Sequence, residues 1–217
     1  CGVIADNVNV AIVSSDSNQR LPDNEVGEIW IRGKSVAAGY WQAADANNAF
    51  HCKYLGQVDH APYVRTGDLG FIRHGELYVT GRLKDLIIVR GVNLYPHDIE
   101  LAVQAVLSSL SLSSIGLAAF SVVYQNEERL AIVIEGSREL VKLSRLTSQS
   151  HKNDTDLEKR LRQLLMAVRK DVSEMFGVRV EFFAFLPPGS FPRTSSGKVQ
   201  RRACKAALQN STLPFLD

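Results

Sequence analysis

The sequence predicts an α+β fold in two parts: a β-rich lobe over residues 1–83, and an α+β domain over residues 84–217 with a small, mainly antiparallel sheet and flanking helices. Short apolar alternations, broken by turn residues, fill the first lobe. After Gly81 the pattern changes to a mixture of strand-like runs and amphipathic helical stripes. A chain of 217 residues is long enough for two such small domains.

Turn residues separate the strands expected in the β-rich lobe. Apolar alternation predicts strands at residues 8–13, 26–31 and 70–73. The pair His74-Gly75 interrupts the last alternating stretch, and glycine readily adopts the backbone angles that a two-residue turn requires. We therefore expect a tight β-hairpin around His74-Gly75.

The α+β domain is expected to begin with a strand at residues 85–90 and a turn at Gly91. A helix should start at Pro96, because proline suits the first helical position. Apolar residues then recur at helical spacing and predict one buried face, made of Ile99, Val103, Val106, Leu107 and Leu110. Two strands at 115–124 and 130–135 follow, and the polar turn between them predicts an antiparallel pair.

A polar segment over residues 138–153 reads as a surface connection to a second helix. Thr155 and Glu158 have the spacing of a capping box, an apolar stripe runs from Leu157 to Met175, and Gly177 marks the end of the helix. A strand over 178–186, a turn and a Ser/Thr/Gly loop come next. A short basic helix is expected over 199–208.

Composition excludes several classes of function. The 25 basic and 23 acidic residues are spread along the chain, and the net charge of +2 argues against a nucleic-acid partner. Cys1, Cys52 and Cys204 are far apart and lack metal-ligand spacing, as do the five histidines, so no metal site is expected. Neither a signal peptide nor an apolar run long enough to span a membrane is present, which favours a cytoplasmic protein.

The loop at residues 192–202 contains the most informative motif. Gly197-Lys198 in a run of small residues is reminiscent of a Walker phosphate loop, but that pattern needs glycine at position 192 and Ser or Thr at position 199. Pro192 and Val199 stand there instead. Taken alone, Lys198 could be an ordinary solvated lysine in an exposed loop.

Three further segments accompany this loop in a fixed order: residues 27–33 with 39–41, residues 63–70 and residues 81–91. Together the four segments resemble the adenylate-forming superfamily of acyl-CoA synthetases, luciferases and peptide-synthetase adenylation domains. Within it, the runs 88–100 and 193–204 look most like the fatty acyl-AMP ligases that feed polyketide and lipopeptide assembly lines. The resemblance extends from residue 1 to about residue 208.

This resemblance implies roles for five residues. Lys198 matches the catalytic lysine that bridges the substrate carboxylate and the α-phosphate of ATP. Asp68 matches the aspartate that binds the ribose hydroxyls, and Arg82 matches an arginine that contacts the nucleotide. Lys84 occupies the hinge position between two poses of the C-terminal lobe, and Gly91 matches the glycine beside the path of the thiol.

Each assignment has a simpler alternative. Asp68 could belong to an ordinary Thr-Gly-Asp turn, and Arg82 could form a surface ion pair. Lys84 could be a solvated loop lysine, with the neighbouring Asp85 as the pivot, and Gly91 could only form a turn. A basic patch near the C-terminus is interpreted as a solvated helix face or a carrier-protein contact, and it comprises Arg201, Arg202 and Lys205.

The implied reaction activates a fatty acid with ATP and Mg²⁺ to acyl-adenylate and pyrophosphate, and then passes the acyl group to the phosphopantetheine thiol of an acyl carrier protein. Alternatives are coenzyme A as acceptor, an amino-acid substrate, or a non-catalytic carrier-docking module. The family's phosphate loop, adenine-binding motif and acyl tunnel, which hold most of the ATP and the Mg²⁺, would precede Cys1. We therefore expect a fragment that is inactive alone and works with the remainder of the N-terminal AMP-binding domain.

Overall fold

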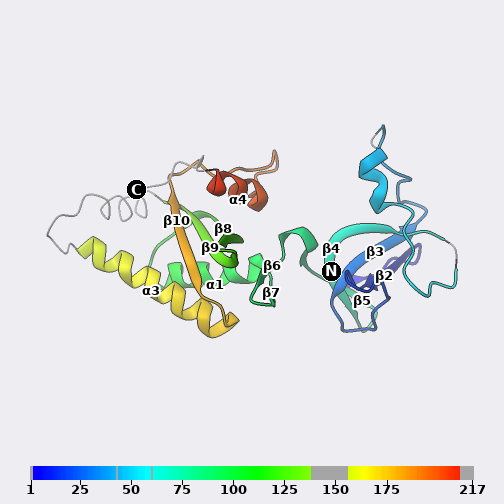
Figure 1. The fold of residues 1–217 in the computed structure, drawn as a ribbon, viewed down its shortest axis with the longest axis horizontal. Helices are drawn as coiled ribbons and strands as arrows, with labels where there is room; N and C mark the ends of the chain where they lie inside the picture. Colours follow the sequence, from blue (N-terminus) through cyan, green and yellow to red (C-terminus); the bar gives the residue numbers. More distant parts are fainter. Residues whose placement is uncertain (1, 43, 60, 138–155, 211–217) are drawn as a thin grey trace. The chain divides into compact units, whose positions relative to one another are not determined.

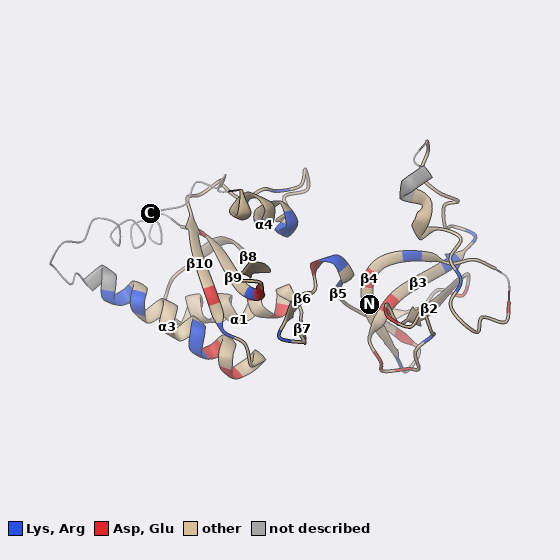
Figure 2. Cartoon of the chain, viewed as in Figure 1, with Lys and Arg blue, Asp and Glu red and all other residues tan. Residues whose placement is uncertain are grey.

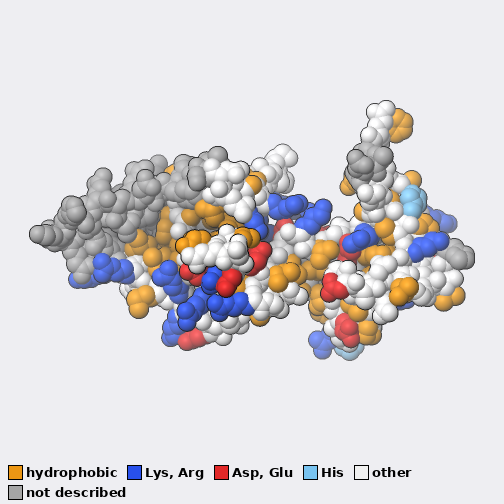
Figure 3. Space-filling view, in the orientation of Figure 1, with side chains coloured by type: hydrophobic (Ala, Val, Ile, Leu, Met, Phe, Trp, Pro, Cys, Tyr) orange, Lys and Arg blue, Asp and Glu red, His pale blue; other side chains and the backbone are white. Residues whose placement is uncertain are grey.

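The computed structural model describes residues 2–42, 44–59, 61–137 and 156–210, and it confirms the predicted α+β class. The chain divides into two compact units, Cys1–Lys84 (unit 1) and Asp85–Asp217 (unit 2). Each unit has its own main sheet (Figure 1) and its own apolar core. On the face shown in Figure 3, acidic and basic side chains lie among one another on both units. No helix among the described residues is long and apolar enough to cross a membrane.

Unit 1 contains a five-stranded antiparallel sheet with strand order β1-β5-β4-β3-β2. The predicted strands at 8–13 and 26–31 are confirmed as β2 and β3, and a short 3-10 helix, η1 (Ala44–Ala49), lies between β3 and β4. One small apolar cluster, in which Trp30 and Tyr63 are the largest side chains, forms the core. The strands are β1 (Gly2–Val3), β2 (Val8–Val13), β3 (Gly27–Gly33), β4 (Val64–Arg73) and β5 (Glu76–Arg82).

The turn predicted at His74-Gly75 joins β4 to β5. Both residues have positive φ, 51° and 77°, as the favoured two-residue hairpin turn requires. Strand β4, however, begins at Val64 rather than at residue 70. Its polar segment at residues 66–68 forms a bulge: Arg65 pairs with Trp30 and Leu69 with Glu28, so three residues of β4 lie opposite a single residue of β3.

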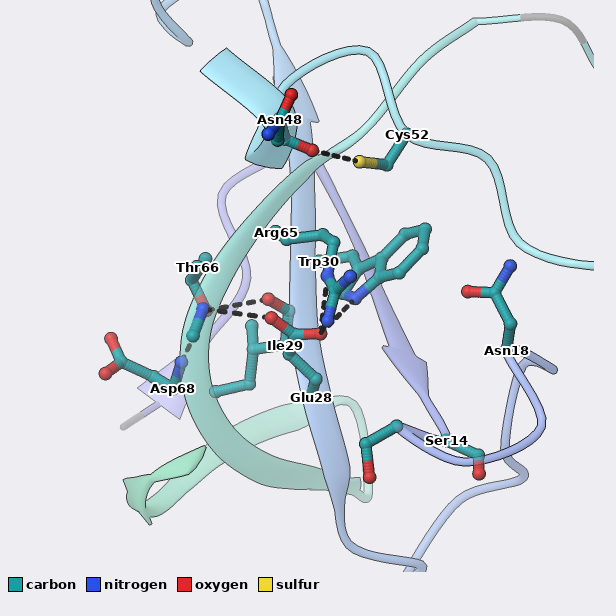
Figure 4. Close-up of polar contacts among 12 residues, drawn as sticks. Ser14, Asn18, Glu28, Ile29, Trp30, Asn48, Cys52, Arg65, Thr66 and Asp68 are labelled. Atoms are coloured by element: carbon teal, nitrogen blue, oxygen red, sulfur yellow. Dashed lines mark hydrogen bonds and ion pairs between the residues drawn. The ribbon is translucent and has the colours of Figure 1, made fainter. Parts of the chain in front are cut away.

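A buried carboxylate holds this bulge in place (Figure 4). Glu28 on β3 is only 2% exposed. It accepts hydrogen bonds from Trp30 Nε1 at 3.0 Å, Arg65 Nε at 2.9 Å and the Gly67 backbone N–H at 3.2 Å. Gly67 has a φ of 73°, which glycine adopts without a steric penalty. A buried carboxylate without hydrogen-bond partners would destabilise the fold by several kcal/mol. The path of β4 brings the Arg65 and Gly67 donors within reach of Glu28 and avoids that penalty.

Unit 2 contains a three-stranded sheet with strand order β10-β9-β8 and a separate β6–β7 hairpin (Figure 1). The antiparallel pairing of β8 with β9 is confirmed, whereas β10 runs parallel to β9. A parallel neighbour requires a crossover connection, which includes helix α3. The elements are β6 (Ile87–Val89), β7 (Val92–Leu94), α1 (Pro96–Ser109), β8 (Ser114–Tyr124), β9 (Glu127–Gly136), α3 (Asp156–Phe176), β10 (Val180–Leu186) and α4 (Arg201–Gln209).

The two faces of this sheet carry different cores, because successive strand residues point to opposite sides. On β9, Leu130, Ile132 and Ile134 pack with residues of α1 and α3. The alternate residues Ala131 and Val133 pack with Phe191 and with Cys204 of α4 on the other face. Helix α4 therefore lies on the face opposite to α1 and α3, together with the loop that precedes it.

The helix boundaries agree closely with the sequence. Helix α1 begins at Pro96 as predicted, and Gly177, with a φ of 69°, follows the last turn of α3. The predicted basic helix at 199–208 is α4, which begins at Arg201. Thr155 of the expected capping box and the expected surface connection at 138–153 lie outside the described residues.

The role of Glu28 can be tested by Glu28→Gln, which keeps the shape but removes the charge and one acceptor. We expect unit 1 to lose about 1–3 kcal/mol of its free energy of unfolding, the cost of losing hydrogen bonds to a buried charged group. Urea unfolding followed by tryptophan fluorescence measures this loss, since both tryptophans of the chain, Trp30 and Trp41, lie in unit 1. The exposed Glu25→Gln is the control, and equal midpoints for both variants would contradict the role of Glu28.

The thiol of Cys204, a residue of α4, is completely buried and should therefore react slowly with alkylating reagents. Desolvation raises the pKa of this thiol from 9.0 to about 11. At pH 8 its thiolate fraction is about 100-fold lower than in the unfolded chain, and the folded state loses relative stability as the pH rises through 9 towards 11. Iodoacetamide labelling at pH 8, read by peptide mass spectrometry with and without urea, should show at least this difference. Equal labelling rates would contradict the prediction.

Candidate functional site

Asp68 and Arg82 are brought together in unit 1. They pair across the last register position of β4 and β5, and Arg82 Nε donates a hydrogen bond to Asp68 Oδ1 at 3.0 Å. The two side chains are 35% and 69% exposed, so solutes can reach both. The structure thus contains the surface ion pair that was the simpler alternative for Arg82.

The Asp68 carboxylate is fixed by the strand bulge rather than by a free turn. The Thr66 hydroxyl donates to the backbone oxygen of Ile29 at 2.7 Å and accepts from the Asp68 N–H at 3.0 Å. Figure 4 shows the Asp68 carboxylate pointing away from Glu28. Among the described residues, only Oδ1 of this carboxylate takes part in a hydrogen bond or ion pair, which leaves Oδ2 able to accept hydrogen bonds from a ligand.

Lys84 is exposed and lies in a short 3-10 helix, η2 (Leu83–Asp85). The division between the two compact units falls directly after it. Its position suits a hinge and equally suits a solvated lysine in a connection.

Gly91 occupies the turn between β6 and β7. Arg90 and Gly91 have φ angles of 52° and 78°, and Val89 pairs with Val92 across them. This geometry belongs to the same favoured two-residue turn class as His74-Gly75. A Cβ at position 91 would meet no atom within 4 Å, so the backbone angle explains this glycine and steric crowding within unit 2 does not.

Lys198 lies on an ordered loop in unit 2. The Thr194 N–H donates to the Lys198 carbonyl oxygen at 2.9 Å, and the Lys198 N–H donates to Thr194 Oγ1 at 3.1 Å. Gly197, with a φ of 82°, forms the turn and donates to the Thr194 carbonyl oxygen at 2.9 Å. The Lys198 side chain is exposed, and its ammonium group has no hydrogen bond or ion pair to any residue that the structure describes. The loop therefore presents an available positive charge from a fixed backbone.

The basic patch expected near the C-terminus is only partly solvated. Basic residues lie at the start of α4 (Figure 2). Arg201, its first residue, is half-buried and forms two 2.6 Å hydrogen bonds to the carboxylate of Glu100 on α1, and its Nη1 lies 3.8 Å from Asp85 Oδ2. The hydrogen bonds to Glu100 raise the pKa of Arg201 above its usual value. Arg201 thus ties α4 to α1, whereas Arg202 is exposed.

Sequence reasoning missed the buried carboxylates that hold these segments, Glu28 in unit 1 and Glu135 in unit 2. Each is an acidic residue directly beside an apolar run of its strand, residues 29–31 in β3 and 130–134 in β9, and this signal is visible in the sequence. The expected site residues fall into two groups: Asp68, Arg82 and Lys84 belong to unit 1, and Gly91 and Lys198 belong to unit 2. Within the described ranges, no three His, Cys, Asp or Glu side chains are grouped so that they could hold a metal ion.

Comparison with known proteins agrees with this arrangement. A model of the AMP-binding enzyme family matches residues 1–41. Over 98% of its length the chain is 37% identical to a medium-chain-fatty-acid–acyl-carrier-protein ligase of Moorena producens, of which it covers 33%. Over 89% of its length it is 40% identical to a probable long-chain-fatty-acid–AMP ligase of Mycobacterium tuberculosis, of which it covers 31%.

Solved structures show the same relationship. A structure from a study of fatty acyl-adenylate ligases of E. coli and L. pneumophila matches 97% of this chain with a TM-score of 0.68 and 30% identity, over 32% of its own length. An McyG adenylation and carrier didomain complexed with phenylalanyl-adenylate matches 94% of this chain with a TM-score of 0.66 and 27% identity, also over 32% of its length. The chain is therefore similar over almost its whole length to part of the adenylate-forming, AMP-binding enzymes, and it spans about one third of the length of the fatty acid ligases that it matches.

Proposed function

We propose that the chain is the C-terminal part of a fatty acyl-AMP ligase, with the end of the AMP-binding domain in residues 1–83 and the lid domain in residues 84–217. The complete enzyme joins a fatty acid to AMP and passes the acyl group to the phosphopantetheine thiol of an acyl carrier protein. The observation that carries this proposal is the available ammonium group of Lys198 on a fixed loop, in a chain 37% identical to a fatty acid ligase over 98% of its length.

Lys198 acts in the first half-reaction. A carboxylate oxygen of the fatty acid attacks the α-phosphorus of ATP, the bond to the bridging oxygen breaks, and pyrophosphate leaves. Negative charge accumulates on the phosphate oxygens and lies close to the attacking carboxylate. A lysine held beside both groups stabilises this charge more strongly in the transition state than in the ground state, which is the condition for faster chemistry.

Asp68 and Arg82 hold the nucleotide. The free Oδ2 of Asp68 accepts hydrogen bonds from ribose hydroxyls, and the exposed guanidinium of Arg82 keeps donors available for ribose or phosphate oxygens. Their ion pair orients both groups before the ligand arrives. In this proposal, ATP and Mg²⁺ are bound mainly by parts of the enzyme outside this chain.

Lys84 and Gly91 serve the second half-reaction in this proposal. Rotation of the backbone at Lys84, at the end of unit 1, swings unit 2 between the adenylate-forming and the acyl-transferring pose. Gly91, in the β6–β7 turn with open space where a Cβ would stand, lets the thin phosphopantetheine arm approach. The 217 residues alone form no acyl-adenylate, because reacting groups must be positioned by both parts of the enzyme.

An amino-acid substrate is the second candidate, and the match to an adenylation domain complexed with phenylalanyl-adenylate favours its inclusion. The fatty acid ranks first because the fatty acid ligases have the higher sequence identity, 37% and 40% against 27%. Coenzyme A is the alternative acceptor of the acyl group. Supplying each acid and each thiol separately distinguishes these possibilities.

The decisive test compares the complete enzyme that carries this chain with its Lys198→Ala variant. Pyrophosphate release is measured with ATP and a panel of fatty acids and amino acids. We expect release with fatty acids, and a loss of about 100-fold or more in kcat for the variant, as for the removal of one transition-state donor.

Lys170→Ala is the matched control, since Lys170 is an exposed lysine on α3 far along the chain from the loop. It should retain the rate of the unmodified enzyme. Pyrophosphate release only with amino acids would indicate an adenylation domain of the peptide-synthetase type. Full activity of Lys198→Ala would contradict the proposed function, and no release with any acid would favour a non-catalytic carrier-docking module.

A further inference from the structure

One buried carboxylate organises the approach to the Lys198 loop. Glu135 lies near the end of β9, the central strand, between Gly116 on β8 and Leu186 on β10. Its relative exposure is 0%. Its Oε1 accepts hydrogen bonds from the backbone N–H groups of Ser190 at 2.9 Å and Phe191 at 3.4 Å. The start of the loop is therefore fixed to the end of the sheet.

The second oxygen of Glu135 binds a residue within the loop itself. Arg193 Nη2 lies 2.5 Å from Glu135 Oε2 and also donates to the carbonyl oxygen of Ile115 at 3.3 Å. The other terminal nitrogen, Nη1, donates to the carbonyl oxygen of Gly197 at 3.2 Å. Gly197 is bonded directly to Lys198, so one guanidinium connects the buried carboxylate to the residue that precedes the lysine.

The side chains of Phe191 and Arg193 pack tightly against β8 and have little room to move. A Cβ on Gly116 would lie 2.7 Å from Phe191 Cδ2 and 2.8 Å from Arg193 Nη2. Both side chains are therefore in close contact with the backbone of β8. Phe191 is also part of the buried cluster beneath α4. The loop is anchored by an apolar side chain and an ion pair at the same place.

From this arrangement we propose that Glu135 and Arg193 are positioning residues for Lys198: they act through the Gly197 carbonyl to set the direction in which the lysine leaves the loop. The inference rests on the catalytic role proposed for Lys198. A planar guanidinium is suited to this task, because its donors form a rigid fork that can bind two oxygens at once. A buried carboxylate with three protein donors gives the fork a fixed attachment.

The test uses Arg193→Lys and Glu135→Gln in the complete enzyme. Arg193→Lys keeps the positive charge beside Glu135 but cannot span both Glu135 and the Gly197 carbonyl. We expect kcat for pyrophosphate release to fall about 10–100-fold in each variant, the loss typical of a misplaced catalytic group, while KM for ATP changes less than about twofold. Hydrogen exchange of the amides at 194–200 should become faster in both.

Two controls separate positioning from a general effect on folding. Glu127→Gln alters the other end of β9, where the side chain is 59% exposed, and should leave kcat unchanged. Adding Arg193→Lys to Lys198→Ala should cause no further loss of kcat, because the group that Arg193 positions is already absent. A purely structural role would lower the activity of the double variant again.

The outcomes distinguish this inference from the proposed function. If Lys198→Ala keeps full activity, both fail together. If Lys198→Ala is inactive while Arg193→Lys keeps the unmodified kcat and the unmodified exchange rates, the positioning role alone is wrong. If Glu135→Gln does not fold, Arg193→Lys decides the question by itself, since the charge that neutralises Glu135 is retained in that variant.

Discussion

A carboxylate that is removed from water must be surrounded by hydrogen-bond donors, and this constraint shapes both units. Glu28 and Glu135 each lie in a β-strand and are almost completely inaccessible. Glu28 accepts hydrogen bonds from Trp30 on its own strand and from residues 65–67, and Glu135 accepts them from residues 190–193. Either carboxylate would destabilise its unit by several kcal/mol if it had no donors. The two segments must therefore run where their donors reach the carboxylates. The proposed nucleotide-binding aspartate and catalytic lysine are placed next to the segments fixed in this way.

The residues proposed to bind the nucleotide and the residue proposed for catalysis belong to different units, Asp68 and Arg82 to one and Lys198 to the other. Catalysis by positioning requires that the reacting atoms be held about 3–3.5 Å apart. Each unit therefore has to hold its own residues in a defined local geometry. The boundary between the units falls directly after Lys84, the exposed residue that we propose as the hinge.

Local patterns predicted most of the fold, because strands, helix starts and tight turns depend on neighbouring residues. The start of α1 at Pro96 and the hairpin at His74-Gly75 are examples. The early start of β4 escaped prediction, because its bulge depends on a contact between Glu28 and Gly67, 39 residues apart. The attachment of Arg193 to Glu135 spans 58 residues and has no local signal beyond one acidic residue directly after an apolar run of β9. The resemblance of the sequence motifs identified the candidate residues, but it did not reveal the buried carboxylates that fix their loops.

A crystal structure of the complete enzyme with an acyl-adenylate analogue would test the roles that we propose for Asp68 and Lys198. We expect Asp68 Oδ2 to lie within about 3 Å of a ribose hydroxyl, and Lys198 Nζ to lie at the same distance from an oxygen of the phosphate or acyl group. An analogue bound with its ribose away from Asp68, or with Lys198 directed into solvent in the adenylate-forming pose, would contradict these roles.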